Sequence, residues 1–211
     1  MTIHNIIFDL GGVVITLDKN KAIRRFKAIG LDNAEQHLDA YTQQGIFGDV
    51  EKGIITPEEF QTKLGQLVNR PVTYEECCHA WQGYAGEVPQ RNLKALEKLR
   101  NDGFRLILLS NTNPFMMEWA GSNRFDGMGH PVQYYFDAVY LSYELHMLKP
   151  DPLFFRKVLL SENILPENTL FIDDGPRNVA AASQLGIFTL CPENGADWTQ
   201  AIFERLKTEK E

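Results

Sequence analysis

Short apolar runs without regular polar alternation recur through most of the chain. They are IIFDL (6–10), FRLILLS (104–110), FDAVYLS (136–142), TLFID (169–173) and, more weakly, IFTLC (187–191). Continuous apolar runs rich in branched residues predict buried strands, and a parallel sheet covered on both faces produces such runs. The pattern therefore indicates an α/β fold built on a parallel sheet.

Helical patterns lie between these runs. Residues 90–102 carry Leu93, Leu96 and Leu99 at helical spacing. Asp151-Pro152 predicts the start of another helix, and a third is predicted from Pro176 to Gly186. Alternation of strands and helices is typical of a doubly wound, Rossmann-like parallel sheet.

Residues 18–86 contain helical patterns and no convincing strand. Thr56 and Glu59, and again Thr73 and Glu76, have the spacing of a capping box at a helix start. We therefore predict an α/β core formed by residues 1–17 and 87–211. An all-helical cap, residues 18–86, is inserted after the first strand.

Composition excludes several classes of function. The 211 residues are 44% hydrophobic and carry a formal net charge of −7, with no Lys/Arg run suited to a phosphate backbone, so we expect no nucleic-acid partner. No apolar run approaches the ~20 residues of a membrane span, so we expect no membrane partner. The odd number of cysteines, three, favours a reduced, cytoplasmic protein.

Polar residues gather where the expected strands end. Sites in open parallel α/β sheets form at the carboxyl ends of the strands, so these residues are expected to meet at one edge. They are Asp9, Ser110, Asn111, Lys149, Asp173 and Asp174.

These residue types suit phosphoryl transfer. A carboxylate nucleophile and a phosphate ester repel one another unless a cation lies between them. Asp9 and Asp174 could hold Mg²⁺, while Lys149 and the Ser110 hydroxyl neutralise the phosphate oxygens. Taken singly, each motif is equally a turn or a surface loop. Their joint occurrence, in this order at successive strand ends, favours a site.

The order of these motifs resembles that of the haloacid dehalogenase-like hydrolase superfamily. FDLGGVV, LLSNTN, the Lys of LKPDPLFF and FIDDGPRN match its four motifs over essentially the whole chain. The resemblance implies a helical-cap phosphatase in which Asp9 becomes an aspartyl-phosphate. It implies Mg²⁺ held by Asp9, the Gly11 carbonyl and Asp174. Ser110, Asn111 and Lys149 would bind the phosphate, and Asp173 would orient Lys149 or a metal-bound water.

Gly11 is a departure from the commonest pattern of the superfamily. Most of its phosphatases carry a second Asp there, which protonates the leaving group and then activates water. The runs FDLGGVV, LSNTN, YLSYELHMLKP and FIDD resemble bacterial α-D-glucose-1-phosphate phosphatases, which also have Gly. General acid–base catalysis contributes on the order of 10²- to 10⁴-fold, so its loss favours a good leaving group or a surrogate acid. We therefore expect a small phosphorylated metabolite as substrate, in particular a sugar 1-phosphate.

Two other functions stay open. A 2-haloacid dehalogenase would use the same aspartate, although the acidic pair Asp173-Asp174 suits a cation that such enzymes do not need. A phosphosugar-binding protein with impaired catalysis would explain Gly11 but would not need a nucleophile.

Several further residues have two interpretations each. Trp81, Tyr84 and Trp119 could line a sugar pocket or pack in the cap. His146 could reach the site, although a surface position is favoured. The Gly-rich segment 120–133 shows no pattern that assigns it.

Overall fold

The computed structural model describes residues 2–39, 41 and 43–208. Five parallel strands form its sheet, in the order β3-β2-β1-β4-β5. The strands are β1 (Asn5–Phe8), β2 (Arg105–Ser110), β3 (Ala138–Leu141), β4 (Thr169–Ile172) and β5 (Phe188–Leu190). The first strand thus lies in the middle, and the sheet extends outward on both sides, as a doubly wound fold requires. The fold class expected from the sequence is confirmed.

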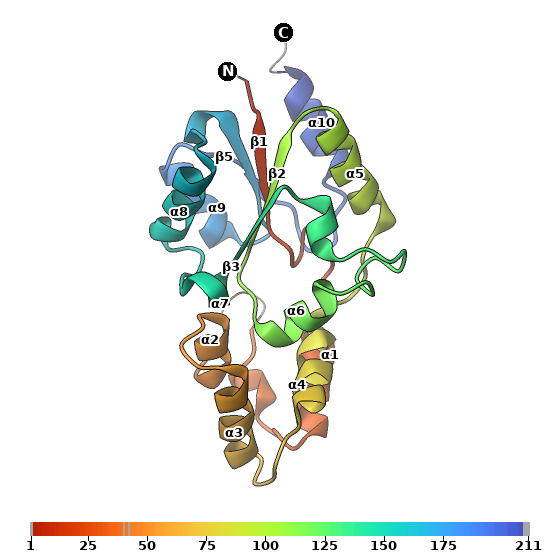
Figure 1. The fold of residues 1–211 in the computed structure, drawn as a ribbon, viewed down its shortest axis with the longest axis vertical. Coiled ribbons are helices and arrows are strands. Elements are labelled where there is room, and N and C mark those ends of the chain that lie inside the picture. The colour runs from red at the N-terminus through yellow and green to blue at the C-terminus, as the bar shows by residue number, and fades with distance from the viewer. Residues whose placement is uncertain (1, 40, 42, 209–211) are drawn as a thin grey trace.

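Helices cover both faces of the sheet (Figure 1). Those outside the cap are α5 (Gln90–Asn101), α6 (Pro114–Ala120), α7 (Ser142–Leu145), α8 (Pro152–Glu162), α9 (Pro176–Gln184) and α10 (Thr199–Thr208). Ile6 and Phe8 pack with α5 and α10, whereas Ile7 packs with α8 and α9. Successive residues of a strand point to opposite faces, so a strand buried on both faces reads as a continuous apolar run.

Four helices form the cap beyond the carboxyl edge of the sheet (Figure 1). They are α1 (Lys19–Ala28), α2 (Ile46–Glu51), α3 (Pro57–Leu67) and α4 (Tyr74–Trp81). Each helix contributes one buried aromatic side chain to a shared cluster: Phe26, Phe47, Phe60 and Trp81. Their ring centroids lie 5.1 Å apart for Phe26–Phe47 and 5.2 Å for Phe47–Phe60. Both predicted capping boxes, at Thr56 and Thr73, are present.

The two chain segments that join cap and core run side by side. The Thr16 and Glu87 backbones are joined by the Thr16 amide, which donates to the Glu87 carbonyl at 2.9 Å. The Gly86 amide donates back to the Thr16 carbonyl at 2.9 Å, and Leu17 pairs antiparallel with Ala85. The boundaries 17/18 and 86/87 stay predictions, but the chain passes between the two parts at one place.

Three differences from the sequence-based elements concern short segments. The strand expected over 136–142 covers only Ala138–Leu141, because Ser142 begins α7. Helices α2 and α6 were not predicted; with 6 and 7 residues they are too short to show a clear apolar period.

In the part of the chain that the structure describes, no helix has the length and apolar character needed to cross a membrane.

Candidate active site

The strand ends bring together the residues that the sequence singled out. Asp9 follows β1, Ser110 is the last residue of β2, and Asp173 and Asp174 follow β4. Lys149 comes from the segment between α7 and α8. All but Asp173 line one cavity of about 80 Å³ between core and cap, together with Gly11 and Asn111.

Lys149 forms the centre of the charged cluster. Its Nζ donates to Asp9 Oδ1 at 2.8 Å and to Asp173 Oδ2 at 2.7 Å. Burial alone would lower the pKa of Lys149, but the two carboxylates raise it above its usual value. The lysine is therefore a fixed positive charge beside Asp9.

Asp173 is held from both sides. Its Oδ1 accepts hydrogen bonds from the Gly175 amide at 2.7 Å and from Asn178 Nδ2, on α9, at 2.9 Å. With its other oxygen on Lys149, Asp173 is fully buried and orients the ammonium. Asn178 is a member of the site that the sequence did not indicate. Its position in the first turn of a helix after an acidic pair is the available signal.

Asn111 positions the backbone of Lys149. The Lys149 amide donates to Asn111 Oδ1 at 2.9 Å, and Asn111 Nδ2 donates to the Lys149 carbonyl at 2.9 Å. The Ser110 hydroxyl makes only a long hydrogen bond of 3.4 Å to the Asn111 carbonyl. The Ser110 hydroxyl therefore has capacity for an incoming oxygen, whereas the polar groups of Asn111 are largely used.

Three carboxylates crowd one point of the cavity. Asp9, Asp173 and Asp174 each offer an oxygen within 4.8 Å of the others. Burial and the neighbouring acids raise the pKa of Asp9 to about 7, against the lowering effect of Lys149. Burial and Asp173 raise the pKa of Asp174 to about 6. One ammonium leaves negative charge in excess, and a hard divalent cation such as Mg²⁺, which prefers oxygen ligands, fits this donor set.

Gly11 and Gly12, which follow Asp9 and Leu10, differ in what would prevent a side chain at each position. Gly12 has φ +75°, and a Cβ there would lie 2.1 Å from Asp174 Oδ2. A side chain at 12 would thus displace a carboxylate of the cluster. At Gly11 a Cβ would meet only the flexible end of Leu17, at 3.0 Å. The absent side chain at 11 is therefore not dictated by backbone conformation.

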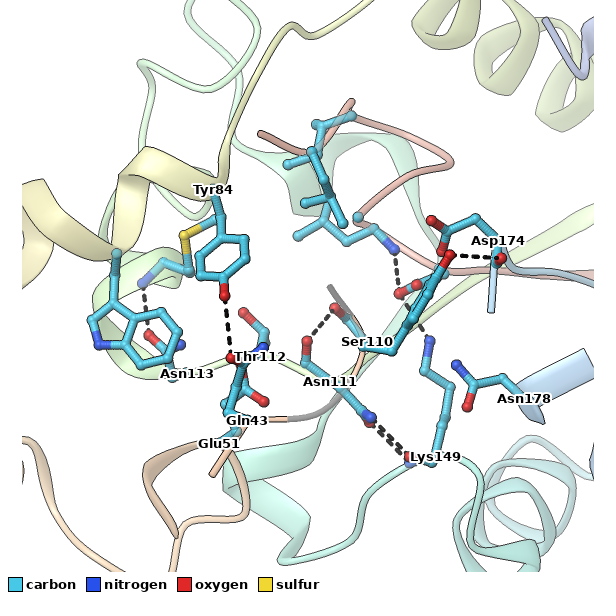
Figure 2. Close-up of a pocket in the computed structure, with 18 residues that line it drawn as sticks. Gln43, Glu51, Tyr84, Ser110, Asn111, Thr112, Asn113, Lys149, Asp174 and Asn178 are labelled. Carbon is cyan, nitrogen blue, oxygen red and sulfur yellow. Dashed lines mark hydrogen bonds and ion pairs between the residues drawn. The ribbon is translucent and has the colours of Figure 1, made fainter. Parts of the chain in front are cut away.

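The other end of the cavity belongs to residues that the sequence analysis only partly identified. Figure 2 shows Lys149, Asp174 and Asn178 at one end, and Glu51, Gln43, Tyr84 and Asn113 at the other. Trp81 and Tyr84 pack in the cap and also line the cavity, so their packing is confirmed while a role in binding a sugar stays a prediction. Trp119 packs on Phe125 and is not among the lining residues.

Glu51 is the main residue that sequence reasoning missed. It ends α2, is buried, and lines the cavity. Its carbonyl accepts a 2.6 Å hydrogen bond from Ser142 Oγ of the core, and the same Oγ lies 3.0 Å from the Thr112 carbonyl. Phe47, Val50 and Glu51 share one helical face. An acidic residue in an otherwise apolar stripe is the sequence signal from which Glu51 could have been predicted.

Two other sequence candidates lie away from the cavity. His146 Nδ1 lies 3.3 Å from the Lys52 carbonyl, against the cap, and does not line the cavity. The segment 120–133 is organised by buried Asp126. Its carboxylate accepts from the Tyr135 hydroxyl at 2.7 Å and the Met128 amide at 2.7 Å.

A parallel sheet with this helical cap and this carboxylate–lysine cluster defines a class of hydrolase. The sequence model of the haloacid dehalogenase-like hydrolases matches residues 3–186. The chain belongs to that family, as the four motifs led us to expect.

Relatives of known description cover almost the whole chain. It is 44% identical over 200 residues to a D-ribitol-5-phosphate phosphatase of Bacteroides thetaiotaomicron, spanning 95% of this chain and 97% of that protein. Its fold is similar to that of a HAD-like family hydrolase from Porphyromonas gingivalis, with TM-score 0.93 and 42% identity over 98% of this chain and 99% of that one.

A third relative was solved with ligands. It is a HAD family enzyme of Bacteroides thetaiotaomicron in complex with magnesium and inorganic phosphate. The TM-score is 0.87 and the identity 39%, over 94% of this chain and 98% of that one. These similarities support the family part of the resemblance. They do not support its narrower part, the likeness to glucose-1-phosphate phosphatases, because the relative of known substrate acts on a pentitol 5-phosphate.

Proposed function

We propose that this protein is a Mg²⁺-dependent phosphatase that hydrolyses a small phosphorylated polyol, of which D-ribitol 5-phosphate is the model. The observation that carries the proposal is the contact of Lys149 with Asp9 at one end of a cavity whose other end is lined by residues of both cap and core. The relative named as a D-ribitol-5-phosphate phosphatase, 44% identical over nearly the whole chain, supports the substrate class.

In the proposed reaction Asp9 is the nucleophile. An oxygen of its carboxylate forms a bond to phosphorus, the ester P–O bond breaks, and the alcohol leaves with its electron pair and takes up a proton from water. Water then attacks the aspartyl-phosphate, releasing inorganic phosphate and restoring Asp9. Lys149 and the Ser110 hydroxyl stabilise the charge on the phosphoryl oxygens.

The charged cluster serves this step in a second way. Asp9, Asp174 and the Gly11 carbonyl would hold Mg²⁺, which supplies positive charge that lets a carboxylate approach an anionic ester. Asp173 keeps Lys149 aimed at Asp9 through its bond to Nζ. Asn111 fixes the Lys149 backbone from the other side. These are positioning roles, exerted through Lys149.

A sugar 1-phosphate is the second candidate substrate. Gly11 offers no side chain to protonate the leaving group, and an anomeric oxygen needs that proton less than a primary alcohol does. A pentitol 5-phosphate has the poorer leaving group and would require a proton from elsewhere. The two substrates therefore differ in whether the site must supply a proton to the leaving group.

Comparing steady-state rates on both esters tests the proposal. With Mg²⁺ present, kcat/KM for D-ribitol 5-phosphate should exceed that for glucose 1-phosphate, and the reverse order would favour the sugar 1-phosphate. Asp9→Asn should lower turnover by at least about 10³-fold, since it removes the nucleophile. Phosphate release that is equally low in wild type and Asp9→Asn, with the esters still bound, would indicate a binding protein. Chloride release from 2-chloropropionate that persists in EDTA would indicate a dehalogenase.

A further inference from the structure

Two residues that line the cap end of the cavity, Trp81 and Asn113, each carry a buried N–H donor without a hydrogen bond of normal geometry to a described residue. Within the described residues, neither Trp81 Nε1 nor Asn113 Nδ2 donates a hydrogen bond of normal geometry, although the Asn113 side chain lies near enough to the Glu51 carboxyl group to affect its pKa. The exposed fraction is 1% for Trp81 and 0% for Asn113, and both residues line the cavity. A buried donor left unpaired costs about 1–3 kcal/mol, so a ligand that brings acceptors to this end of the cavity gains binding free energy from these two groups.

A buried carboxyl group lies at the same end. Burial raises the pKa of Glu51 to about 8, and the nearby Asn113 amide offsets only part of that rise. At neutral pH the Glu51 side chain is therefore mainly a neutral acid. A neutral carboxyl group both donates and accepts a hydrogen bond, as a hydroxyl partner requires.

Core residues fix where Glu51 lies. Ser142 Oγ donates to the Glu51 carbonyl, and Gly53 packs so tightly that a Cβ would lie 2.1 Å from the Tyr143 carbonyl. Asn113 is held as well, because its Oδ1 accepts from the Met116 amide at 3.1 Å and caps α6. Glu51 and Asn113 are thus both held in place by contacts outside the cavity.

We propose that Glu51, Trp81 and Asn113 form a subsite that binds hydroxyl groups on the alcohol part of the substrate. The inference rests on the proposed function, because the phosphate is taken to lie at the Asp9 end. Glu51 and Asn113 lie at the opposite end of the cavity from Lys149 and Asp174 (Figure 2), where the chain of a short polyol would extend. Two donors and one group that both donates and accepts match neighbouring hydroxyls, whereas an alkyl chain would offer none of the three a hydrogen bond.

A matched pair of esters isolates this subsite. D-Ribitol 5-phosphate and n-pentyl phosphate are both primary esters of a five-carbon chain, but only the first has hydroxyls along it. The measured quantity is the ratio of their kcat/KM values. We expect Glu51→Ala to lower this ratio about tenfold or more, mostly through a higher KM for ribitol 5-phosphate. Glu51→Gln, which keeps one donor and one acceptor group, should stay within about threefold of wild type.

Trp81→Phe provides a second variant that keeps an aromatic ring in the cap cluster and removes only the Nε1 donor. It should lower the ratio in the same direction. Glu58→Gln is the matched control, an exposed glutamate at the start of α3 outside the cavity. It should leave the ratio unchanged. Thermal unfolding of each variant checks that the fold is retained.

Two results would overturn the inference. One is an equal loss on both esters in Glu51→Ala and Trp81→Phe, which would indicate a structural role. The other is a lower kcat with unchanged KM for ribitol 5-phosphate in Glu51→Gln, which would make Glu51 the proton donor instead. Failure of the proposed function looks different, since wild type itself would then hydrolyse neither ester.

Discussion

At the scale of single residues, Gly12 links the backbone to the acidic cluster. Its φ of +75° alone disfavours a side chain, and Asp174 occupies the place of its Cβ. Gly127 has a similar φ, +70°, but no atom lies within 4 Å of its Cβ position. Comparing alanine substitutions at Gly12 and Gly127 therefore distinguishes the effect of backbone strain from the effect of displacing Asp174.

We predict that Gly12→Ala loses Mg²⁺-dependent phosphatase activity by about tenfold or more, because Asp174 must move. Gly127→Ala should lose only about 1–2 kcal/mol of unfolding free energy, from backbone strain. Urea unfolding and the Mg²⁺ concentration that gives half-maximal rate measure the two effects. Identical losses of activity in both variants would contradict the role given to Gly12.

Glu51 gives a pH dependence with a definite sign. Its usual pKa is 4.5 and burial raises it to about 8 in the folded protein. Between those values the folded state keeps a proton that the unfolded chain has released, so stability falls as pH rises. This contribution is fully present below pH 4.5 and is lost as the pH rises through about 8.

We therefore predict that wild type loses stability relative to Glu51→Gln between pH 5 and pH 8. The difference in unfolding free energy should change by up to about 1.4 kcal/mol per pH unit. Urea titrations of both proteins across this range measure it. Subtracting one curve from the other removes the contributions of Asp9 and Asp174, which titrate in both, and a flat difference would contradict the prediction.

At the scale of elements, the sequence predicted helix starts correctly wherever a nearby side chain caps the free backbone N–H groups of the helix. Thr56 and Thr73 form their capping boxes, and Asp151 and Pro152 start α8 as expected. The strand at 136–142 was overestimated because the chain turns into α7 at Ser142, whose side chain bonds to the Glu51 carbonyl of the cap. No local pattern reveals a partner that lies 91 residues away.

The two ends of the site differ in the same way: one could be predicted from local sequence and the other depends on contacts between distant parts of the chain. Asp9, Ser110 and Asp174 were predictable because the parallel strands that carry them must end at one edge. Glu51 and Asn113 come from separate parts of the chain that meet only when the cap docks on the core. Asn113 also caps α6, so its sequence pattern indicates a helix start and gives no sign of the subsite role proposed for it.

At the scale of the whole molecule, the acidic cluster couples cation binding to stability. Bringing three carboxylates together beside one lysine opposes folding, and a bound cation relieves that repulsion. A ligand that binds only the folded state stabilises it by about 2.7 kcal/mol at a hundred times its Kd.

We predict that Mg²⁺ raises the thermal midpoint of wild type and that EDTA reverses the rise. Asp174→Asn should abolish most of the Mg²⁺ effect, because it removes a ligand and part of the repulsion together. Asp32→Asn, at an exposed aspartate of the cap, should respond to Mg²⁺ as wild type does. A full Mg²⁺ response in Asp174→Asn would contradict this assignment of the cation site.

The paired linkers matter for how such an enzyme diversifies. Since Thr16 and Gly86 are hydrogen-bonded neighbours, the chain leaves the core and returns to it at almost the same point. Insertions with adjacent ends disturb the host fold least. A recombination event could therefore exchange the whole cap in one step. The descendant would have a different substrate specificity but would keep the residues of the core that carry out the reaction.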